Sequence, residues 1–177
     1  NQNLINYYSN KRFYELKGVL SDKDAKSTLS DFLQNNIDLT IELLFGLKLF
    51  PFQSFILSQW LNKGFCINIV SRGGSKSWLA ALFCCLYAVF NPTKRIVITS
   101  ASFRSSRAIL NQIDKFINAD GATLLKQCFP HDLRKATDLW EMSLFGDGFI
   151  KAVPLNEKIR GHRADVLFCD EGLLINK

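Results

Sequence analysis

The apolar residues of the chain fall into short runs and into longer segments with helical spacing. The runs 65–70 and 95–99 are bounded by glycine or small polar residues, which predicts two buried strands. Each run is followed by a small polar loop and then by apolar residues three or four positions apart, over 76–90 and again beyond residue 102. This order of strand, helix, strand and helix predicts an α/β fold with a parallel sheet.

A hairpin and a last strand complete the predicted sheet. The segments 140–144 and 149–153 flank the turn Gly146-Asp147-Gly148, which predicts a β-hairpin inserted into the fold. The polar loop 156–163 then precedes the apolar run 165–169, which we expect to be the final strand.

The front of the chain predicts a helical extension. Ser21 and Asp24 form a capping pattern before apolar residues at helical spacing. Pro51 can start a further helix that ends at Gly64. We therefore expect an N-terminal extension at 1–48 and one domain at 49–177 that is incomplete at its C-terminus.

The composition of the chain excludes some classes of protein but does not indicate a function. Apolar residues make up 47% of the chain and charged residues 21%, as in an ordinary soluble globular protein. No run approaches the roughly 20 apolar residues of a membrane span. The five cysteines show neither a CxxC pair nor nearby histidines at ligand spacing, and three of them lie in apolar core segments, which predicts buried free thiols in a reducing compartment. The net charge of +6 suits a polyanionic partner, but it is also common in proteins that bind no nucleic acid.

The loop Ser71-Arg72-Gly73-Gly74-Ser75-Lys76-Ser77 has the parts of a phosphate-binding loop. In such a loop backbone N–H groups surround phosphate oxygens, a lysine binds the terminal phosphates and a hydroxyl binds Mg²⁺. The match to GxxxxGK(S/T) is imperfect, because Val70 and Ser75 stand where the two glycines are expected. The alternative is a Ser/Gly loop with a solvated lysine between a core strand and a core helix.

Two adjacent carboxylates, Asp170 and Glu171, directly follow the last apolar run. At the carboxyl end of a strand, an aspartate can hold Mg²⁺, usually through water, while a glutamate orients and deprotonates the attacking water. Alone, such a pair is also typical of a solvated loop. With a phosphate loop upstream it predicts a P-loop NTPase of the RecA-like, additional-strand class with a catalytic glutamate.

Three motifs resemble the ATPase domain of large terminase subunits, the DNA-packaging motors of tailed bacteriophages and herpes-type viruses. The loop 71–77 fits the degenerate form (S/G)RxxxK(S/T), including the missing first glycine. The string 159–171 is similar to the terminase pattern IRGxRAD-hhhh-DE. Phe50-Pro51-Phe52-Gln53 resembles an adenine-recognition motif in which a glutamine amide binds the purine edge. The resemblance covers approximately 49–172.

The resemblance implies ATP and Mg²⁺ as cofactors and assigns roles to individual residues. Glu171, Lys76 and Arg72 would act in catalysis, Arg72 by stabilising charge on the γ-phosphate in the transition state. Asp170 and Ser77 would hold the metal. The residues implied to bind the nucleotide are Gln53, Ser71, Arg72, Gly73, Gly74, Ser75, Lys76 and Ser77.

Other basic residues have less specific roles in the resemblance. Ser102, Arg104 and Arg107 would couple hydrolysis to DNA movement, and Arg160 and Arg163 would order the loop before the last strand. A capped or solvated surface position is the alternative for each of them. His131 and His162 have no companion ligands at metal spacing, so neither is assigned to a metal.

The resemblance also implies partners and a location. It implies double-stranded viral DNA, a portal protein, a small terminase subunit and a homo-oligomeric ring. The ring would work in the host cell cytoplasm, transiently docked on a procapsid and without a membrane. Nuclease activity would belong to a further domain that is not part of this chain.

Two other functions stay open. A RecA-like helicase would show an intact GxGK(S/T) and DExx(H/D/Q), whereas Gly172 and Leu173 follow the acidic pair in this chain. A P-loop-shaped assembly protein would bind nucleotide without hydrolysing it, although this chain retains Lys76, Ser77, Asp170 and Glu171.

Overall fold

The computed structural model describes residues 23–71, 73–137, 139–154, 161 and 163–170. The chain divides into two compact units, 1–40 and 41–177. In the first unit, α2 (Lys23–Asn35) is followed at once by α3 (Ile37–Phe45), whose first residues belong to this unit. The hydroxyl of Thr40 donates a 2.6 Å hydrogen bond to the carbonyl of Leu33, which ties the start of α3 to the end of α2.

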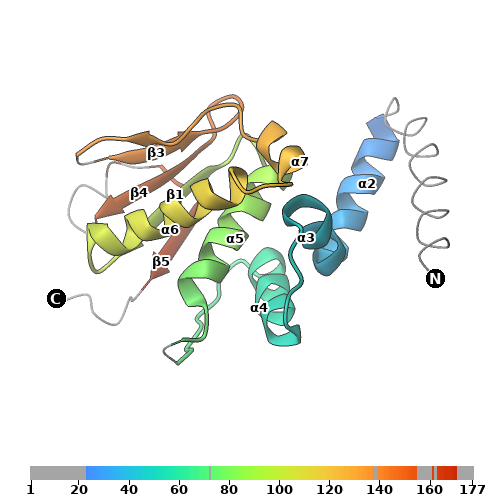
Figure 1. Cartoon of the computed structure of the whole chain (residues 1–177), viewed down its shortest axis with the longest axis horizontal. Helices are drawn as coiled ribbons and strands as arrows, with labels where there is room; N and C mark the ends of the chain where they lie inside the picture. The colour runs from blue at the N-terminus through green and yellow to red at the C-terminus, as the bar shows by residue number, and fades with distance from the viewer. Residues whose placement is uncertain (1–22, 72, 138, 155–160, 162, 171–177) are drawn as a thin grey trace. The chain divides into compact units, whose positions relative to one another are not determined.

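The second unit contains a five-stranded mixed sheet in the order β2-β3-β4-β1-β5 (Figure 1). The strand β1 (Arg95–Ser100) lies between β4 (Phe149–Pro154) and β5 (Val166–Asp170) and is parallel to both. On the far side of β4, β3 (Trp140–Ser143) and the short β2 (Arg134–Lys135) add antiparallel pairs. The chain is therefore a mixed α/β fold with a parallel core, as the strand-helix alternation predicts.

Helices α5 (Lys76–Phe90) and α6 (Phe103–Ile117) lie side by side over one face of the sheet (Figure 1). Nearly every residue of α5 between Leu79 and Ala88 is buried, which explains its uniformly apolar sequence. The helix α6 is amphipathic instead, with a buried stripe that includes Ile109, Leu110 and Ile113. Two further helices, α4 (Pro51–Asn62) and the short α7 (Thr123–Gln127), flank this layer.

The predicted hairpin is part of the sheet rather than an insertion beside it. Its second strand, β4, pairs in parallel with β1 from Arg95 opposite Phe149 to Ser100 opposite Pro154. The turn before β4 sits tightly on the chain that enters β1, because a Cβ on Gly148 would overlap the backbone of Pro92 and Thr93. This close approach requires glycine and fixes the hairpin turn against the start of β1.

The prediction of a buried strand at 65–70 is wrong for the described part of the chain. This segment forms no strand, and Phe65, Ile67 and Ile69 are 82%, 76% and 89% exposed. Alternating apolar residues make a strand only where a neighbouring strand completes the hydrogen bonds. On this side the sheet ends at β5, which pairs with β1.

Among the residues that the structure describes, no helix has the length and apolar character that crossing a membrane requires.

Candidate phosphate and metal site

The candidate site lies where the loop before α5 meets the carboxyl end of β5. The hydroxyl of Ser77, in the first turn of α5, donates a 3.1 Å hydrogen bond to the Oδ2 atom of Asp170, the last residue of β5. The two residues are 93 positions apart in the chain. The fold therefore joins the two motifs that the sequence predicts to share one metal.

The side chain of Lys76 turns back across the loop. Its Nζ atom donates hydrogen bonds of 2.8 Å to the carbonyl of Val70 and 3.3 Å to that of Ser71. These bonds hold a positive charge at the N-terminus of α5, where the first N–H groups of a helix have no partner within the helix. Ser75, at the cap position, makes no side-chain capping bond there. The arrangement suits an anion.

The backbone of the loop keeps the conformations that glycine usually supplies. Gly73 has φ of 82°, and Ser75 lies in the left-handed region with φ of 57° and ψ of 24°. A Cβ on Gly74 would overlap the side chain of Val70, and its N–H donates to the carbonyl of Ser71 at 3.2 Å. Ser75 stands where the general motif has glycine, so the residue differs while the backbone conformation remains.

Gln53 has a local structural bond in this fold. It is 7% exposed, and its Oε1 atom accepts a 2.9 Å hydrogen bond from the backbone N–H of Phe50 at the start of α4. This is one half of a capping box, in which a residue three positions into the helix satisfies the cap N–H. The sequence signal for this role is incomplete, because Phe50 stands where a capping box has serine or threonine and only Gln53 matches it.

The other predicted residues lie on α6 and before β5. The Ser102 hydroxyl caps α6 by accepting a 3.2 Å hydrogen bond from the backbone N–H of Ser105. This contact is the capped position that the sequence offers as the alternative to a role in DNA movement. Arg104 is exposed on α6, and Arg163 is exposed before β5. Arg107 packs its guanidinium against two rings. Three predicted residues lie outside the described part of the chain: Arg72, Arg160 and Glu171.

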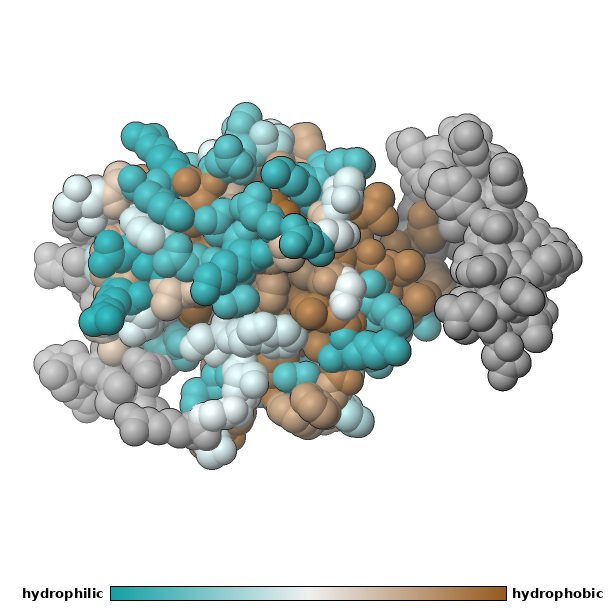
Figure 2. Space-filling view, viewed as in Figure 1, coloured by the Kyte–Doolittle hydropathy of each residue, from teal (hydrophilic) through white to brown (hydrophobic). Residues whose placement is uncertain are grey.

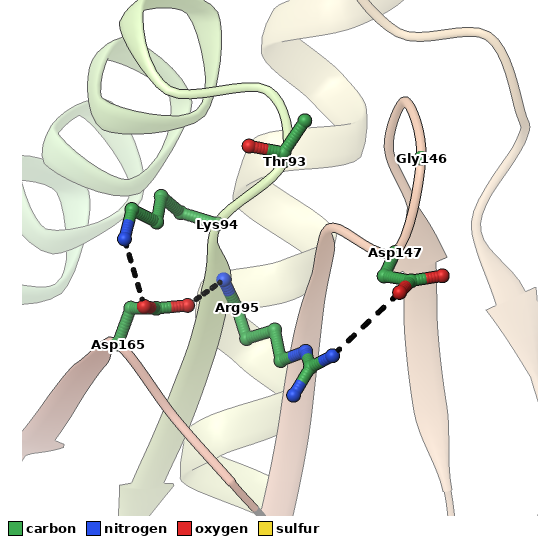
Figure 3. Close-up of a pocket in the computed structure, with 6 residues that line it drawn as sticks. All are labelled: Thr93, Lys94, Arg95, Gly146, Asp147 and Asp165. Carbon is green, nitrogen blue, oxygen red and sulfur yellow. Dashed lines mark hydrogen bonds and ion pairs between the residues drawn. The ribbon is translucent and has the colours of Figure 1, made fainter.

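A second hollow lies at the opposite, amino-terminal end of β1 and β5 (Figure 3). Asp165, just before β5, accepts 3.0 Å and 2.9 Å hydrogen bonds from Lys94 Nζ and from the backbone N–H of Arg95. The N–H of Asp165 in turn donates to the carbonyl of Arg95 at 2.8 Å. The bond from the Arg95 N–H, followed by that from Lys94, lowers the pKa of Asp165. Sequence reasoning missed this clamp, which aligns the start of β5 with β1.

The charges of this second hollow are paired with one another. Besides the Lys94–Asp165 pair, the guanidinium of Arg95 lies 3.8 Å from the carboxylate of Asp147 on the hairpin turn (Figure 3). Two cations facing two carboxylates leave little net charge for a ligand. We therefore assign the hollow to strand alignment, and the candidate chemistry to the Ser77–Asp170 end.

The cysteines divide between core and surface. Cys84 and Cys85 on α5 are buried free thiols, as predicted, and burial raises the pKa of both. Cys66 and Cys169 are exposed, so the prediction of burial is wrong for them. In the described residues no three His, Cys, Asp or Glu side chains group as metal ligands.

No protein-family model matches the chain, and no curated protein matches it either. The assignment of a function therefore rests on the geometry of the chain itself.

We predict that Ser75→Gly stabilises the chain by about 1 kcal/mol. The left-handed region costs a non-glycine residue roughly 1–2 kcal/mol. Part of the gain from glycine is offset, because glycine loses more backbone freedom on folding. Ser75→Val should destabilise it, because a β-branched side chain tolerates this conformation least. Urea denaturation measures both changes, and a stability order with valine above glycine would contradict the left-handed conformation of Ser75.

We predict that Asp165→Asn lowers the melting temperature at pH 7. Because the pKa of Asp165 is lowered in the folded chain, its carboxylate stabilises the fold above its ordinary pKa of about 4. This contribution is lost as the pH falls through the lowered pKa, so the two proteins should converge in stability as acid is added. Asp147→Asn is the control, since that side chain is 90% exposed. A difference that persisted unchanged at about pH 2 would argue against the clamp.

Proposed function

We propose that this chain is the nucleotide-hydrolysing core of a P-loop ATPase of the RecA-like, additional-strand class. The observation that carries the proposal is the 3.1 Å contact between Ser77 and Asp170. It places a hydroxyl from a helix N-terminus beside a carboxylate from a strand end. In open α/β sheets, ligands bind outside the carboxyl ends of the strands, and this contact lies there.

The two oxygen atoms fit Mg²⁺. This small, hard cation takes oxygen ligands at about 2.1 Å in octahedral geometry, so two neighbouring ligands lie about 3 Å apart. The Ser77 hydroxyl oxygen and the Asp170 Oδ2 atom have this separation. The carboxylate would bind Mg²⁺ either directly or through a water molecule. Mg²⁺ bound at these oxygens would neutralise charge on the phosphates. Nucleotide oxygens and water would supply the remaining ligands, which is typical of Mg²⁺ in such enzymes.

The other residues of the loop bind the phosphates and stabilise their charge in this proposal. The backbone N–H groups at 73–77 and the ammonium of Lys76 bind the phosphate chain, and Lys76 exchanges its carbonyl partners for phosphate oxygens when nucleotide binds. Arg72 stabilises the charge that develops on the γ-phosphate. Gln53 would read adenine by donating from its Nε2 amino group, since its Oε1 atom already accepts a hydrogen bond from the N–H of Phe50.

Glu171 follows Asp170 in sequence and acts as the general base in this proposal. It accepts a proton from water as the water oxygen bonds to the γ-phosphorus. The bond between that phosphorus and the β–γ bridging oxygen breaks, and ADP and phosphate leave.

We further propose, from the motif resemblance, that the ATPase belongs to a terminase. It would drive double-stranded DNA into a procapsid as part of a ring in the host cytoplasm, with a portal protein and a small terminase subunit as partners. The string 159–171 supports this choice, and Gly172-Leu173 after the acidic pair disfavours a helicase. A non-hydrolysing assembly protein is the second candidate. It differs from the first in that it binds ATP without hydrolysing it.

We predict that Lys76→Ala weakens binding of Mg-ATP at least tenfold. Hydrogen bonds to charged groups contribute about 1.5–3 kcal/mol, which corresponds to roughly 10- to 100-fold in affinity. Titration with a fluorescent ATP analogue measures the change. Lys63→Ala removes another exposed lysine, at the end of α4, and should leave affinity unchanged. Equal affinity of the Lys76→Ala variant and the unaltered chain would remove the phosphate-loop assignment.

We predict that Glu171→Gln binds Mg-ATP normally but releases phosphate at least 100-fold more slowly, because a positioned general base contributes about 10²–10⁴-fold. Steady-state phosphate release with DNA added measures the rate, and nucleotide titration confirms that the site is intact. Equal rates in the two proteins would sink the hydrolysis mechanism. Binding without turnover in either protein would favour the assembly protein.

A further inference from the structure

The outer side of α6 presents basic and amide side chains along its length. Arg104 and Lys115 are exposed, and Asn111 lies half-buried between them. Arg104 and Lys115 are eleven positions apart, which is three helical turns, so they lie on the same side of α6 about 16 Å apart. Figure 2 shows a hydrophilic surface over this helix. We call Arg104, Arg107, Asn111, Gln112 and Lys115 the α6 face.

The positive charges of the α6 face are not neutralised from the helix itself. Asp114 is the one acidic residue in α6, and its carboxylate is bound by Lys135 at 3.2 Å and by the amide of Asn118 at 3.0 Å. Neither Arg104 nor Lys115 forms an ion pair within the described residues. The face therefore carries a net positive charge that suits a polyanion.

Arg107 is held in place before any ligand arrives. Its guanidinium carbon lies 4.6 Å from the ring centre of Phe103 and 5.3 Å from that of Trp140 on β3. Stacking on aromatic rings leaves the edge of a guanidinium available for hydrogen bonds to phosphate oxygens. Because its position is already restricted, less side-chain entropy is lost on binding.

The α6 face continues into a hollow beside the candidate phosphate and metal site. The hollow has a volume of about 370 Å³. Its lining residues come from the first turn of α5 and from α6: Ser77, Trp78, Ala108, Asn111, Gln112 and Lys115. A ligand on the α6 face therefore lies next to Ser77, which also contacts Asp170.

We propose that the α6 face binds the phosphodiester backbone of nucleic acid, with Arg104, Arg107 and Lys115 each on a phosphate of the same strand. A length of about 16 Å corresponds to roughly five steps of 3.4 Å along one DNA strand. Amide side chains between the cations supply neutral donors to phosphate and sugar oxygens. The inference deepens the proposed function and rests on it, because it locates the track of the motor beside its nucleotide site.

The test is binding of a fluorescein-labelled duplex of mixed sequence, about 30 base pairs long, measured by anisotropy at several salt concentrations without nucleotide. The double variant Arg104→Glu/Lys115→Glu should weaken binding at least tenfold. The slope of log K against log salt should become shallower by about 2, one for each lost phosphate contact. Circular dichroism shows that each variant is folded, and Arg104→Gln/Lys115→Gln gives the same test with a milder change.

The matched control is Lys48→Glu/Lys63→Glu, which changes the net charge equally at exposed positions outside the α6 face. It should keep the salt slope of the unaltered chain. An equal loss in both double variants, or binding of polyglutamate in place of DNA, overturns the proposal. The variant Lys76→Ala distinguishes this inference from the proposed function, because it should weaken nucleotide binding at least tenfold while DNA binding persists. Loss of DNA binding in the α6 variants alongside normal ATP affinity in Lys76→Ala keeps this inference and removes the ATPase.

Discussion

The parallel ladder between β1 and β5 is the constraint on which the candidate site depends. The Asp165 clamp sets its start, and Val166, Phe168 and Asp170 then share one face because side chains alternate along a strand. Phe168 packs against Trp60 and Phe83, with ring centres 5.4 Å and 6.3 Å apart, so this face is the one covered by α4 and α5. A slip of one residue would turn Asp170 to the opposite face and away from Ser77.

Local signals made much of this arrangement predictable from sequence. The apolar run of α5, its stop at Asn91-Pro92 and the paired glycines of the hairpin turn each specify their element without distant contacts. The two motifs predicted Ser77 and Asp170 at one site, and the two side chains are in contact although the segment before the loop forms no strand of the sheet. The Asp165 clamp was not predictable in this way, because its partners Lys94 and Arg95 are 71 and 70 positions away and belong to no motif.

The segment 65–70 shows the limit of periodicity as a signal. Its alternating apolar residues satisfy the pattern of a strand, but a strand also needs the backbone groups of a neighbour. In the described structure β5 ends the sheet on this side, and Leu167 on β5 is 55% exposed as well. Pattern alone therefore does not decide whether a segment forms a strand.

The loop at 71–77 departs from the usual motif in residue type, because serine stands at position 75 where glycine is expected. Ser75 adopts the backbone that glycine adopts readily, at a cost of roughly 1–2 kcal/mol that the surrounding structure must offset. The close approach of Gly74 to Val70 and the bonds of Lys76 to the carbonyls of Val70 and Ser71 supply that support. The left-handed conformation of Ser75 is therefore held by contacts within the loop itself.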